Sequence, residues 1–412
     1  RRLLLLRVRQ AFSHPHGRRL ACITPRRLRK APQICPCTPP MAASGDEQLL
    51  LHLKLAFFAL EPPARVLALA RKAGGGSVTP QVQNFILENC IGTNVGGGQN
   101  YAYVETILKK VIAEAELSSE IVTDELYEEL GQCMLSKANN SSLNVANKIY
   151  KDISFLSPTY DNDSLNTVSL VARLSCSTNM LEGDTGCCLW PSSLFLSEFI
   201  LSFPELFSKK CCFELGSGVG LVGVCLNYVG ASKVILTDGD ASTLTNMKAN
   251  MEMNNLYTED SQLFKNKVEC KYLSWEEASD KDLWDCERDV VLGADIVYNP
   301  SCVPHLVRVL SMLLRGDDGR RHRSVDAAAN EETSDVNGAT GGRVAYIATV
   351  IRNVDTFNCF AKAAADAKLS IVNIASTAAP SSFLPYMLSY DRSSVQLLKI
   401  KLSSSDTDDH NS

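Results

Sequence analysis

Several features that mark whole classes of protein are missing from this sequence of 412 residues. It has no unbroken apolar run of the roughly 18–20 residues that a membrane-spanning helix needs. A lysine, a glutamate and two prolines interrupt its best stretch, residues 49–69. The fifteen cysteines form no Cys-x-x-Cys pair, and only His52 and His305 of the six histidines fall in segments that we expect to be ordered. We therefore expect no membrane span, no metal site, and cysteines that are buried thiols in a reducing cytoplasm.

The first forty residues lack acids altogether, although they carry nine arginines and one lysine, and the first methionine is Met41. An arginine-rich leader without acids is typical of organelle transit peptides, but prolines break any amphipathic period here. We interpret residues 1–40 as a basic leader that is either not native to the mature protein or disordered. A targeting signal is the alternative.

Positive charge is scarce in the rest of the chain. Without the ten basic residues of the leader, 31 basic residues face 46 acidic ones, a net charge of about −15. A body with this charge repels phosphate backbones. We expect a protein partner in the cytoplasm, with no direct binding to nucleic acid and no membrane contact.

Two patterns divide the chain. Residues 41–155 have a local helical periodicity, which predicts a helical N-terminal region. Strands then alternate with helices through residues 156–403, which predicts a parallel sheet covered on both faces. The expected fold class is α/β, a seven-stranded Rossmann-like domain that follows a helical region. The polar stretch 316–342 is predicted to be a disordered insertion, and residues 404–412 an acidic, solvated tail. The expected strands are Cys211–Leu215, Lys233–Thr237, Lys267–Tyr272, Val290–Ala294, Val344–Val350, Leu369–Ile374 and Val395–Leu402.

The end of the first of these strands carries two overlapping nucleotide signatures, in "FELGSGVGLVG". Gly218, Gly220 and Gly223 form a Gly-x-Gly-x-x-Gly pattern, which alone is weak evidence for a dinucleotide site. Glu214 and Gly216 precede it. A carboxylate here would repel a pyrophosphate, whereas S-adenosylmethionine has no phosphate and carries an ammonium and a sulfonium. The acid therefore favours the sulfonium cofactor; a tight turn without a ligand is the alternative.

Polar and aromatic residues follow the next strands. Asp238 lies at the spacing where an acid binds ribose hydroxyls in either cofactor class. Trp275 comes just after the third strand, where an indole can flank an adenine, although a half-buried tryptophan explains the spacing equally well. After the fourth strand, Ala294 would border the cofactor, while Asp295 and Tyr298 would face an incoming methyl acceptor.

The helix after Asp238 carries two stripes. Leu244, Met247 and Met251 are predicted to face the sheet. Asn246, Asn250 and Asn254 are predicted to form a solvated stripe.

With these residues in place, the sequence resembles the seven-β-strand class I methyltransferases of the lysine-specific group. The (Asp/Glu)-x-x-(Tyr/Phe) element of that group matches residues 295–298. Within the group it resembles the eukaryotic elongation factor 2 lysine methyltransferases, family 86, over roughly residues 49–402. The stretches that carry this resemblance are "TDELYEEL", "TGCCLWPSSLFLSEFI", "FELGSGVGLVG", "VIRNVDTF" and "SFLPY".

The resemblance implies an S-adenosyl-L-methionine-dependent protein-lysine N-methyltransferase with elongation factor 2 as substrate, a helical region that helps to recognise it, and a monomer. By the same resemblance Trp190 packs against the cofactor, Gly216, Ser217 and Gly218 line its methionine end, Asp238 binds its ribose, and Trp275 with Ala294 borders the adenine. Asp295 would orient the acceptor ammonium, and Tyr298 would wall the channel. The sequence departs from the family pattern at Pro191, Asn299 and the 316–342 insertion.

Four alternatives stay open at this point. One is a methyltransferase that acts on another protein. A second is a methyltransferase for glutamine or nucleic-acid amines, which would place (Asp/Asn)-Pro-Pro-(Tyr/Phe) where this chain has Asp295–Pro300. A third is an NAD-dependent oxidoreductase, suggested by the embedded glycine pattern. The last is a catalytically inactive binding module that keeps the fold.

Overall fold

A computed structural model describes most of the chain, and the described residues all belong to one compact unit, Ala42–Ser412. The predicted leader, the predicted insertion 316–342 and the predicted tail 404–412 lie outside the described residues. The described residues are 45–92, 100–140, 148–158, 167–177, 184–257, 268–279, 283, 288–315 and 343–403.

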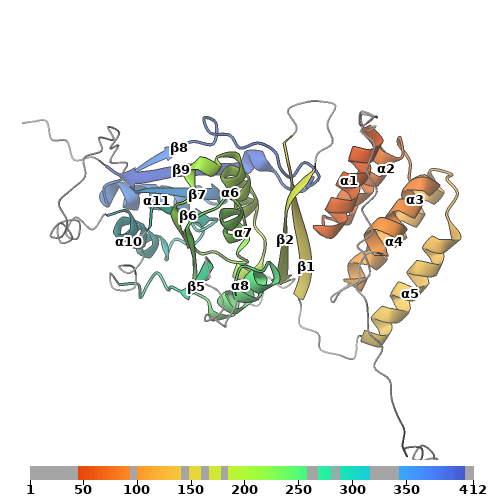
Figure 1. Cartoon of the computed structure of the whole chain (residues 1–412), viewed down its shortest axis with the longest axis horizontal. Helices are drawn as coiled ribbons and strands as arrows, with labels where there is room; N and C mark the ends of the chain where they lie inside the picture. The colour runs from red at the N-terminus through yellow and green to blue at the C-terminus, as the bar shows by residue number, and fades with distance from the viewer. Residues whose placement is uncertain are drawn as a thin grey trace, which may run out of the picture. The chain divides into compact units, whose positions relative to one another are not determined.

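Helices fill the N-terminal region, as predicted (Figure 1). Asn100 begins α4, where its side chain accepts a hydrogen bond from the Tyr103 N–H. Apolar residues then recur on one face of α4 at helical spacing and are buried. None of the described helices has both the length and the apolar character to cross a membrane. The helices here are α1 (Gly45–Phe58), α2 (Pro63–Ala73), α3 (Pro80–Ile86), η1 (Leu87–Ile91), α4 (Tyr101–Leu117) and α5 (Asp124–Asn140).

A two-stranded antiparallel hairpin follows, made of β1 (Lys148–Leu156) and β2 (Val168–Ser177). The prediction of a helical region over residues 41–155 is wrong at its end, because β1 already begins at residue 148. The predicted boundary between residues 155 and 156 therefore falls within β1, and the division into two domains stays a prediction.

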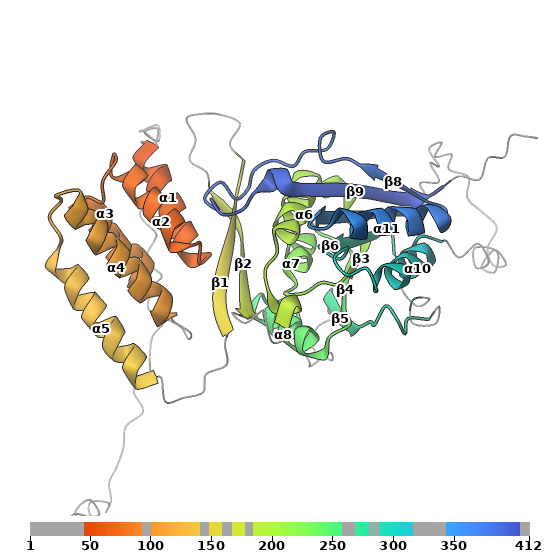
Figure 2. The same ribbon diagram turned by 180° about the vertical axis from the view of Figure 1, so that it is seen from behind.

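All seven predicted strands are present, with every end within one residue of its predicted position. They form one sheet in the order β5-β4-β3-β6-β7-β9-β8 (Figure 2). The expectation of a parallel sheet is wrong for β9, which runs antiparallel to both β7 and β8. The strands are β3 (Cys211–Leu215), β4 (Lys233–Asp238), β5 (Val268–Tyr272), β6 (Val290–Ala294), β7 (Val344–Val350), β8 (Leu369–Asn373) and β9 (Val395–Leu402).

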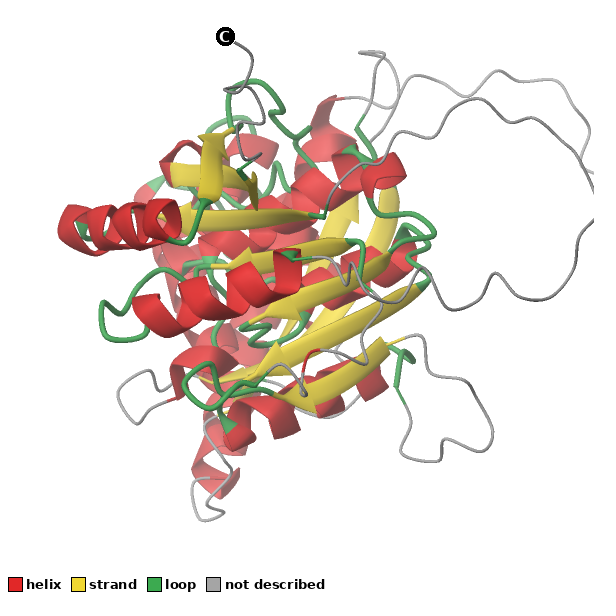
Figure 3. Cartoon of the chain, turned by 90° about the vertical axis from the view of Figure 1, so that its left-hand side faces the viewer, coloured by secondary structure: helices red, strands yellow, loops and turns green. Residues whose placement is uncertain are grey.

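Helices cover both faces of the sheet, as predicted (Figure 3). Successive residues of a strand point to opposite faces, so Cys212 and Phe213 of β3 belong to different buried clusters. One cluster contains α6 (Pro191–Ser202), α7 (Leu221–Tyr228) and α8 (Ala241–Met253); the other contains α10 (Val303–Leu314) and α11 (Val354–Asp366).

The asparagine stripe of α8 is not solvated, contrary to the prediction. Asn246 and Asn250 are buried, at 3% and 0% exposure. Asn250 accepts a hydrogen bond from the Ser175 N–H (2.8 Å) and donates one to the Ser175 carbonyl (3.2 Å). Asn254 makes the same pair of contacts with the backbone of Arg173. The side-chain amides therefore bind the edge of β2 as a neighbouring strand would. The other stripe is as predicted, since Met247 and Met251 are fully buried.

Candidate functional site

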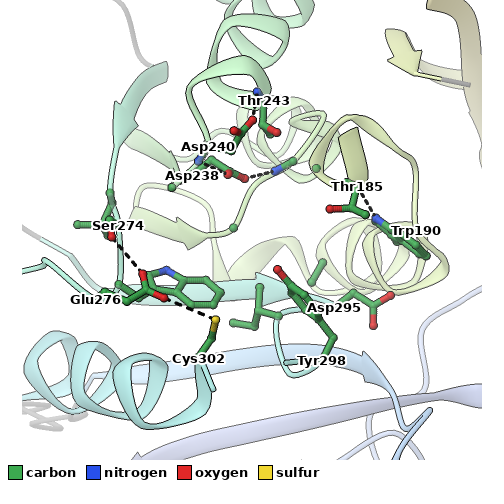
Figure 4. Close-up of a pocket in the computed structure, with 18 of the residues that line it drawn as sticks. Thr185, Trp190, Asp238, Asp240, Thr243, Ser274, Glu276, Asp295, Tyr298 and Cys302 are labelled. Carbon is green, nitrogen blue, oxygen red and sulfur yellow. Dashed lines mark hydrogen bonds between the residues drawn. The ribbon is translucent and has the colours of Figure 1, made fainter. Parts of the chain in front are cut away.

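A cavity of about 460 Å³ lies at the carboxyl ends of the parallel strands (Figure 4). Its walls come from the segments that follow β3, β4, β5, β6 and β7, together with residues 185–190 ahead of α6. The crevice beyond the carboxyl ends of such a sheet is where open α/β folds bind ligands. Its volume suits a small molecule of nucleoside size.

Two glycines of the turn after β3 form one wall of the cavity. Gly216 and Gly218 have φ values of +60° and +55°, which favour glycine, and both line the cavity. A Cβ built on Gly216 would lie 2.8 Å from Ile296 Cγ2 and 3.4 Å from the Trp275 ring. The absence of that Cβ leaves room in front of the indole.

Gly220 and Gly223 serve the packing of α7 and do not line the cavity. A Cβ on Gly220 would lie 2.6 Å from Met251 Cε, and one on Gly223 would lie 2.6 Å from Leu236 Cδ1. The last two glycines of the Gly-x-Gly-x-x-Gly pattern are therefore explained by the close packing of α7 against its neighbours. The prediction that Gly220 contacts the cofactor finds no support in this position.

Glu214 lies behind the turn and does not face the cavity. It is 1% exposed, and its Oε2 atom has no hydrogen-bond partner among the residues that the structure describes. Burial raises the pKa of its carboxyl group to about 8. Ser217 is also buried behind the turn, where its hydroxyl accepts from the Thr237 N–H (3.1 Å). Neither residue lines the cavity, so the expected direct contacts of Glu214 and Ser217 with the cofactor find no support there and stay predictions.

Asp238 forms the next wall, at the end of β4. Its carboxylate accepts hydrogen bonds from the Gly218 N–H (3.2 Å) and the Asp240 N–H (3.1 Å), one on each oxygen. Burial raises the pKa of this carboxyl group. Asp240 also lines the cavity, and it caps α8 by accepting from the Thr243 N–H (2.7 Å). The free lone pairs of Asp238 leave it able to accept from two hydroxyl groups of a ligand.

Trp275 gives the cavity an aromatic side wall. The backbone carbonyl of Trp275 accepts a hydrogen bond from Arg308 Nη2 (2.8 Å), which ties this loop to α10. Ala294 at the end of β6 and Ile296 in the loop after it also line the cavity. An apolar slot beside an acid that can accept from hydroxyl groups has the chemistry that would suit a nucleoside.

The remaining end of the cavity contains the residues predicted to receive an acceptor. Asp295 has a φ of +60°, which is uncommon for a residue with a side chain. Its carboxylate accepts two hydrogen bonds from Arg352, at 2.9 Å and 2.7 Å. The guanidinium carbon of Arg352 lies 5.1 Å from the centroid of the Trp190 ring. Tyr298 lines the same end and is 60% exposed.

The segment before α6, residues 185–190, packs on the glycine turn after β3. Trp190 donates a hydrogen bond from its indole N–H to the Thr185 carbonyl (3.0 Å). A Cβ on Gly186 would lie 2.4 Å from Thr243 Oγ1, and a Cβ on Gly218 would lie 3.0 Å from the Gly186 carbonyl. This backbone therefore packs directly on α8 and on the turn, with no space for side chains between them.

We expect Gly186→Ala to lower the free energy of unfolding by about 1–3 kcal/mol, because the new methyl group must displace the β-branched Thr243 at the start of α8. Gly131→Ala is the matched control, since a Cβ there meets nothing within 4 Å and alanine favours the helix. Urea unfolding of both variants measures the difference. Equal stability of the two variants would contradict the tight packing.

The charge of the cavity is predominantly negative. Four carboxylates line it, those of Asp238, Asp240, Glu276 and Asp295, and Arg352 is its one basic lining residue among those that the structure describes. A pyrophosphate would meet this excess of negative charge, whereas a cationic ligand would be attracted by it. The negative charge that we expected from Glu214 is therefore supplied to the cavity by other acids.

The structure brings most of the predicted site residues together. Those that line the cavity are Trp190, Gly216, Gly218, Asp238, Trp275, Ala294, Asp295 and Tyr298. Residues that the sequence reasoning missed include Thr185, Gly186, Asp240, Thr243, Glu276, Cys302 and Arg352. The stretch "VIRNVDTF" contained a signal for Arg352, a basic residue directly after a predicted strand. Within the described ranges, no group of histidines, cysteines and acids could hold a metal ion.

Comparison with known proteins gives three findings. Residues 171–322 match the family model described as lysine methyltransferase. An uncharacterized protein of Dictyostelium discoideum is 35% identical over 53% of this chain and 59% of its own length. The mouse protein-lysine N-methyltransferase EEF2KMT is 26% identical over 64% of this chain and 68% of its own length.

These matches span between about three fifths and two thirds of the length of the curated relatives. A solved precorrin-6y C5,15-methyltransferase from Geobacter metallireducens aligns with 52% of this chain and 87% of its own, at 11% identity and a TM-score of 0.30. That likeness is too weak to carry an argument. The lysine methyltransferase family model therefore matches part of this chain, and its sequence relatives include a protein-lysine N-methyltransferase.

Proposed function

We propose that this chain is an S-adenosyl-L-methionine-dependent protein-lysine N-methyltransferase and that elongation factor 2 is its substrate. The observation that carries the proposal is the cavity itself. One end combines a glycine turn with a ribose-binding acid, and the other presents Asp295 and Tyr298 from the loop after β6. The match of residues 171–322 to the lysine methyltransferase family model favours lysine methylation among the reactions that this fold supports.

The described residues fit the proposed cofactor. Gly216 and Gly218 lack the Cβ atoms that would fill the cavity, Asp238 has free acceptor positions for ribose hydroxyls, and Trp275 offers an indole for an adenine. The four lining carboxylates favour a ligand with an ammonium and a sulfonium. When bound, the cofactor supplies a methyl group on a positively charged sulfur.

The protein's own contribution would be to position a lysine amine and remove its charge. A free lysine has a pKa of about 10.4, so reaching the neutral amine near pH 7.4 costs about 4 kcal/mol. A desolvated channel lowers that cost, because burial disfavours the charged form. Holding the amine in line with the methyl group then converts a bimolecular encounter into a local one.

Asp295 and Tyr298 are the residues that would receive the acceptor. Asp295 was predicted to orient the ammonium, but two of its acceptor positions are already taken by Arg352. It therefore has limited capacity for a further donor. Tyr298 is exposed enough to contact a protein segment outside the cavity, and its ring can face a methylated ammonium.

The substrate, the compartment and the oligomeric state are further parts of the proposal. Elongation factor 2 is supported by the family 86 resemblance and by the abbreviation EEF2KMT in the name of the mouse relative. A helical region that helps to bind it is supported by its packing on the catalytic domain, where Glu61 accepts from the Ser389 N–H (2.8 Å). We propose a cytoplasmic monomer that binds no nucleic acid.

Incubation with labelled S-adenosylmethionine and purified elongation factor 2 tests the proposal. We expect label on a lysine of elongation factor 2, identified by mass spectrometry. Asp238→Ala should reduce transfer at limiting cofactor at least about tenfold, because the ribose loses charge-assisted hydrogen bonds. Label on a different protein of a eukaryotic lysate would replace the substrate but keep the activity. No binding of the cofactor by calorimetry would end the proposal.

A further inference from the structure

Arg352 contacts both Asp295 and Trp190 at the acceptor end of the cavity. It donates from Nη1 to Asp295 Oδ1 at 2.9 Å and from Nη2 to Asp295 Oδ2 at 2.7 Å, a bidentate pair. The Asp295 side chain in this pair is 5% exposed, while that of Arg352 is 45% exposed. The pair connects the loop after β6 to the loop after β7.

A third segment joins this pair. The Arg352 guanidinium lies over the Trp190 ring, with 5.1 Å between its central carbon and the ring centroid. Trp190 is itself held by its hydrogen bond to the Thr185 carbonyl. Three segments far apart in the sequence are thus linked by one side chain, and all three line the cavity. A lysine in this position could not supply both the planar fork and the stacking surface.

The charge of the pair matters for a lysine acceptor. An isolated carboxylate favours the ammonium form of a nearby amine, and the ammonium cannot attack a methyl group. A guanidinium at a similar distance has the opposite effect. Each partner alone would therefore alter the acceptor's protonation substantially, whereas together they largely cancel.

We propose that Arg352 is a positioning residue for methyl transfer, which fixes Asp295 and Trp190 at the acceptor end of the cavity and neutralises Asp295 so that the acceptor lysine reacts as its uncharged amine. This inference rests on the proposed function. It assigns Asp295 a different role, as one half of a neutral ion pair and not as a free anion.

Other titratable side chains surround the pair, and they are the same in every variant compared below. Those lining the cavity are Asp238, Asp240, Glu276, Tyr298 and Cys302, with Glu214 buried behind the glycine turn. Glu276 has Cys302 as a hydrogen-bond donor at 3.6 Å and the charge of His305 nearby. Differences between variants at positions 295 and 352 therefore report on the pair alone.

The test is the pH dependence of single-turnover methyl transfer at saturating cofactor. Arg352→Met should raise the apparent pKa of the acceptor by about one unit, because Asp295 is then uncompensated. Its rate should fall about tenfold at pH values below both apparent pKa values, and the loss should disappear above them, so the profile is measured past the apparent pKa of the variant. Asp295→Asn should lower the same pKa, and the double variant should return it close to the wild-type value.

Two further variants separate charge from geometry. Arg352→Lys keeps the positive charge, so its pKa should stay near the wild-type value while its rate falls at every pH, since the bidentate contact is lost. Arg173→Met removes a matched bidentate pair with Asp152, on the β1–β2 hairpin outside the cavity. It should leave both the profile and the rate unchanged.

An Arg352→Met variant that loses rate equally at all pH values would overturn the inference, because a purely structural role moves no pKa. Retention of the full wild-type rate would overturn it as well. If Arg352→Met fails to fold, the lowered pKa expected for Asp295→Asn and its return close to the wild-type value in the double variant decide the question. A wild-type protein that binds the cofactor but methylates no protein would instead remove the proposed function, and the inference with it.

Discussion

Gly218→Arg is expected to abolish cofactor binding, with at least a hundredfold loss of affinity, while the protein stays folded. Gly218 has a φ of +55°, and its Cα faces the cavity with the Gly186 carbonyl 3.0 Å from an ideal Cβ. An arginine side chain would have to leave through the cavity and would fill the space of the ligand. It would also place a cation where a sulfonium should bind. Calorimetric titration with S-adenosylmethionine measures the loss.

Gly131→Arg is the matched control for this variant. The same substitution at Gly131 adds an arginine to α5, where nothing lies within 4 Å of the new Cβ. It should bind the cofactor like the wild type. Circular dichroism should show the same helix content for both variants. If Gly218→Arg binds the cofactor normally, the glycine turn does not form its binding wall.

Glu214→Gln is expected to remove a large pH dependence of stability. Burial raises the pKa of the Glu214 carboxyl group to about 8 in the folded protein, from 4.5. The folded state therefore holds a proton that the unfolded state releases between these pH values. By linkage, this group contributes stability that is present below pH 4.5 and is lost as the pH rises through about 8.

Between pH 5 and pH 9 the loss of this contribution lowers the free energy of unfolding by about 4 kcal/mol. The Glu214→Gln variant has no such loss, because glutamine does not titrate. Urea unfolding at both pH values should therefore show the wild type weakening relative to Glu214→Gln as the pH rises. Glu205→Gln is the control, since Glu205 is exposed after α6 and should leave the slope unchanged. Parallel pH profiles for wild type and Glu214→Gln would show that the carboxyl group is ionised when folded.

The same residue illustrates how far sequence reasoning reached at the site. An acid before alternating glycines predicted a turn that does line the cavity, but the acid itself is buried behind that turn. Both faces of β3 are buried, so neither set of its alternating side chains is exposed to solvent. The alternation of residues along the strand therefore did not predict on which face of the sheet Glu214 would lie. The acids that do line the cavity lie at or after the ends of other strands, and they are Asp238, Asp240, Glu276 and Asp295.

Arg352 was missed for a different reason. Its partner Asp295 is 57 residues away in the sequence, and the contact exists only because β6 and β7 are neighbours in the sheet. The asparagines of α8 show the same limit. The spacing of the three asparagines correctly predicted that they share one face of the helix. From sequence alone a polar helix face is expected to be solvated, because the strand edge that lies beside it is not known.

Local chemistry was sufficient wherever a residue's environment depended on its near neighbours in the chain. Apolar strand runs, turn glycines and helix-capping residues act over a few positions, so the α/β class, the seven strands and the glycine turn were determined by the sequence itself. Strand direction at β9, the burial of Glu214 and the ion pair of Asp295 were decided only in the tertiary structure. Each of these depends on which distant segment becomes a neighbour, because charge, hydrogen bonding and burial act through space and not along the chain.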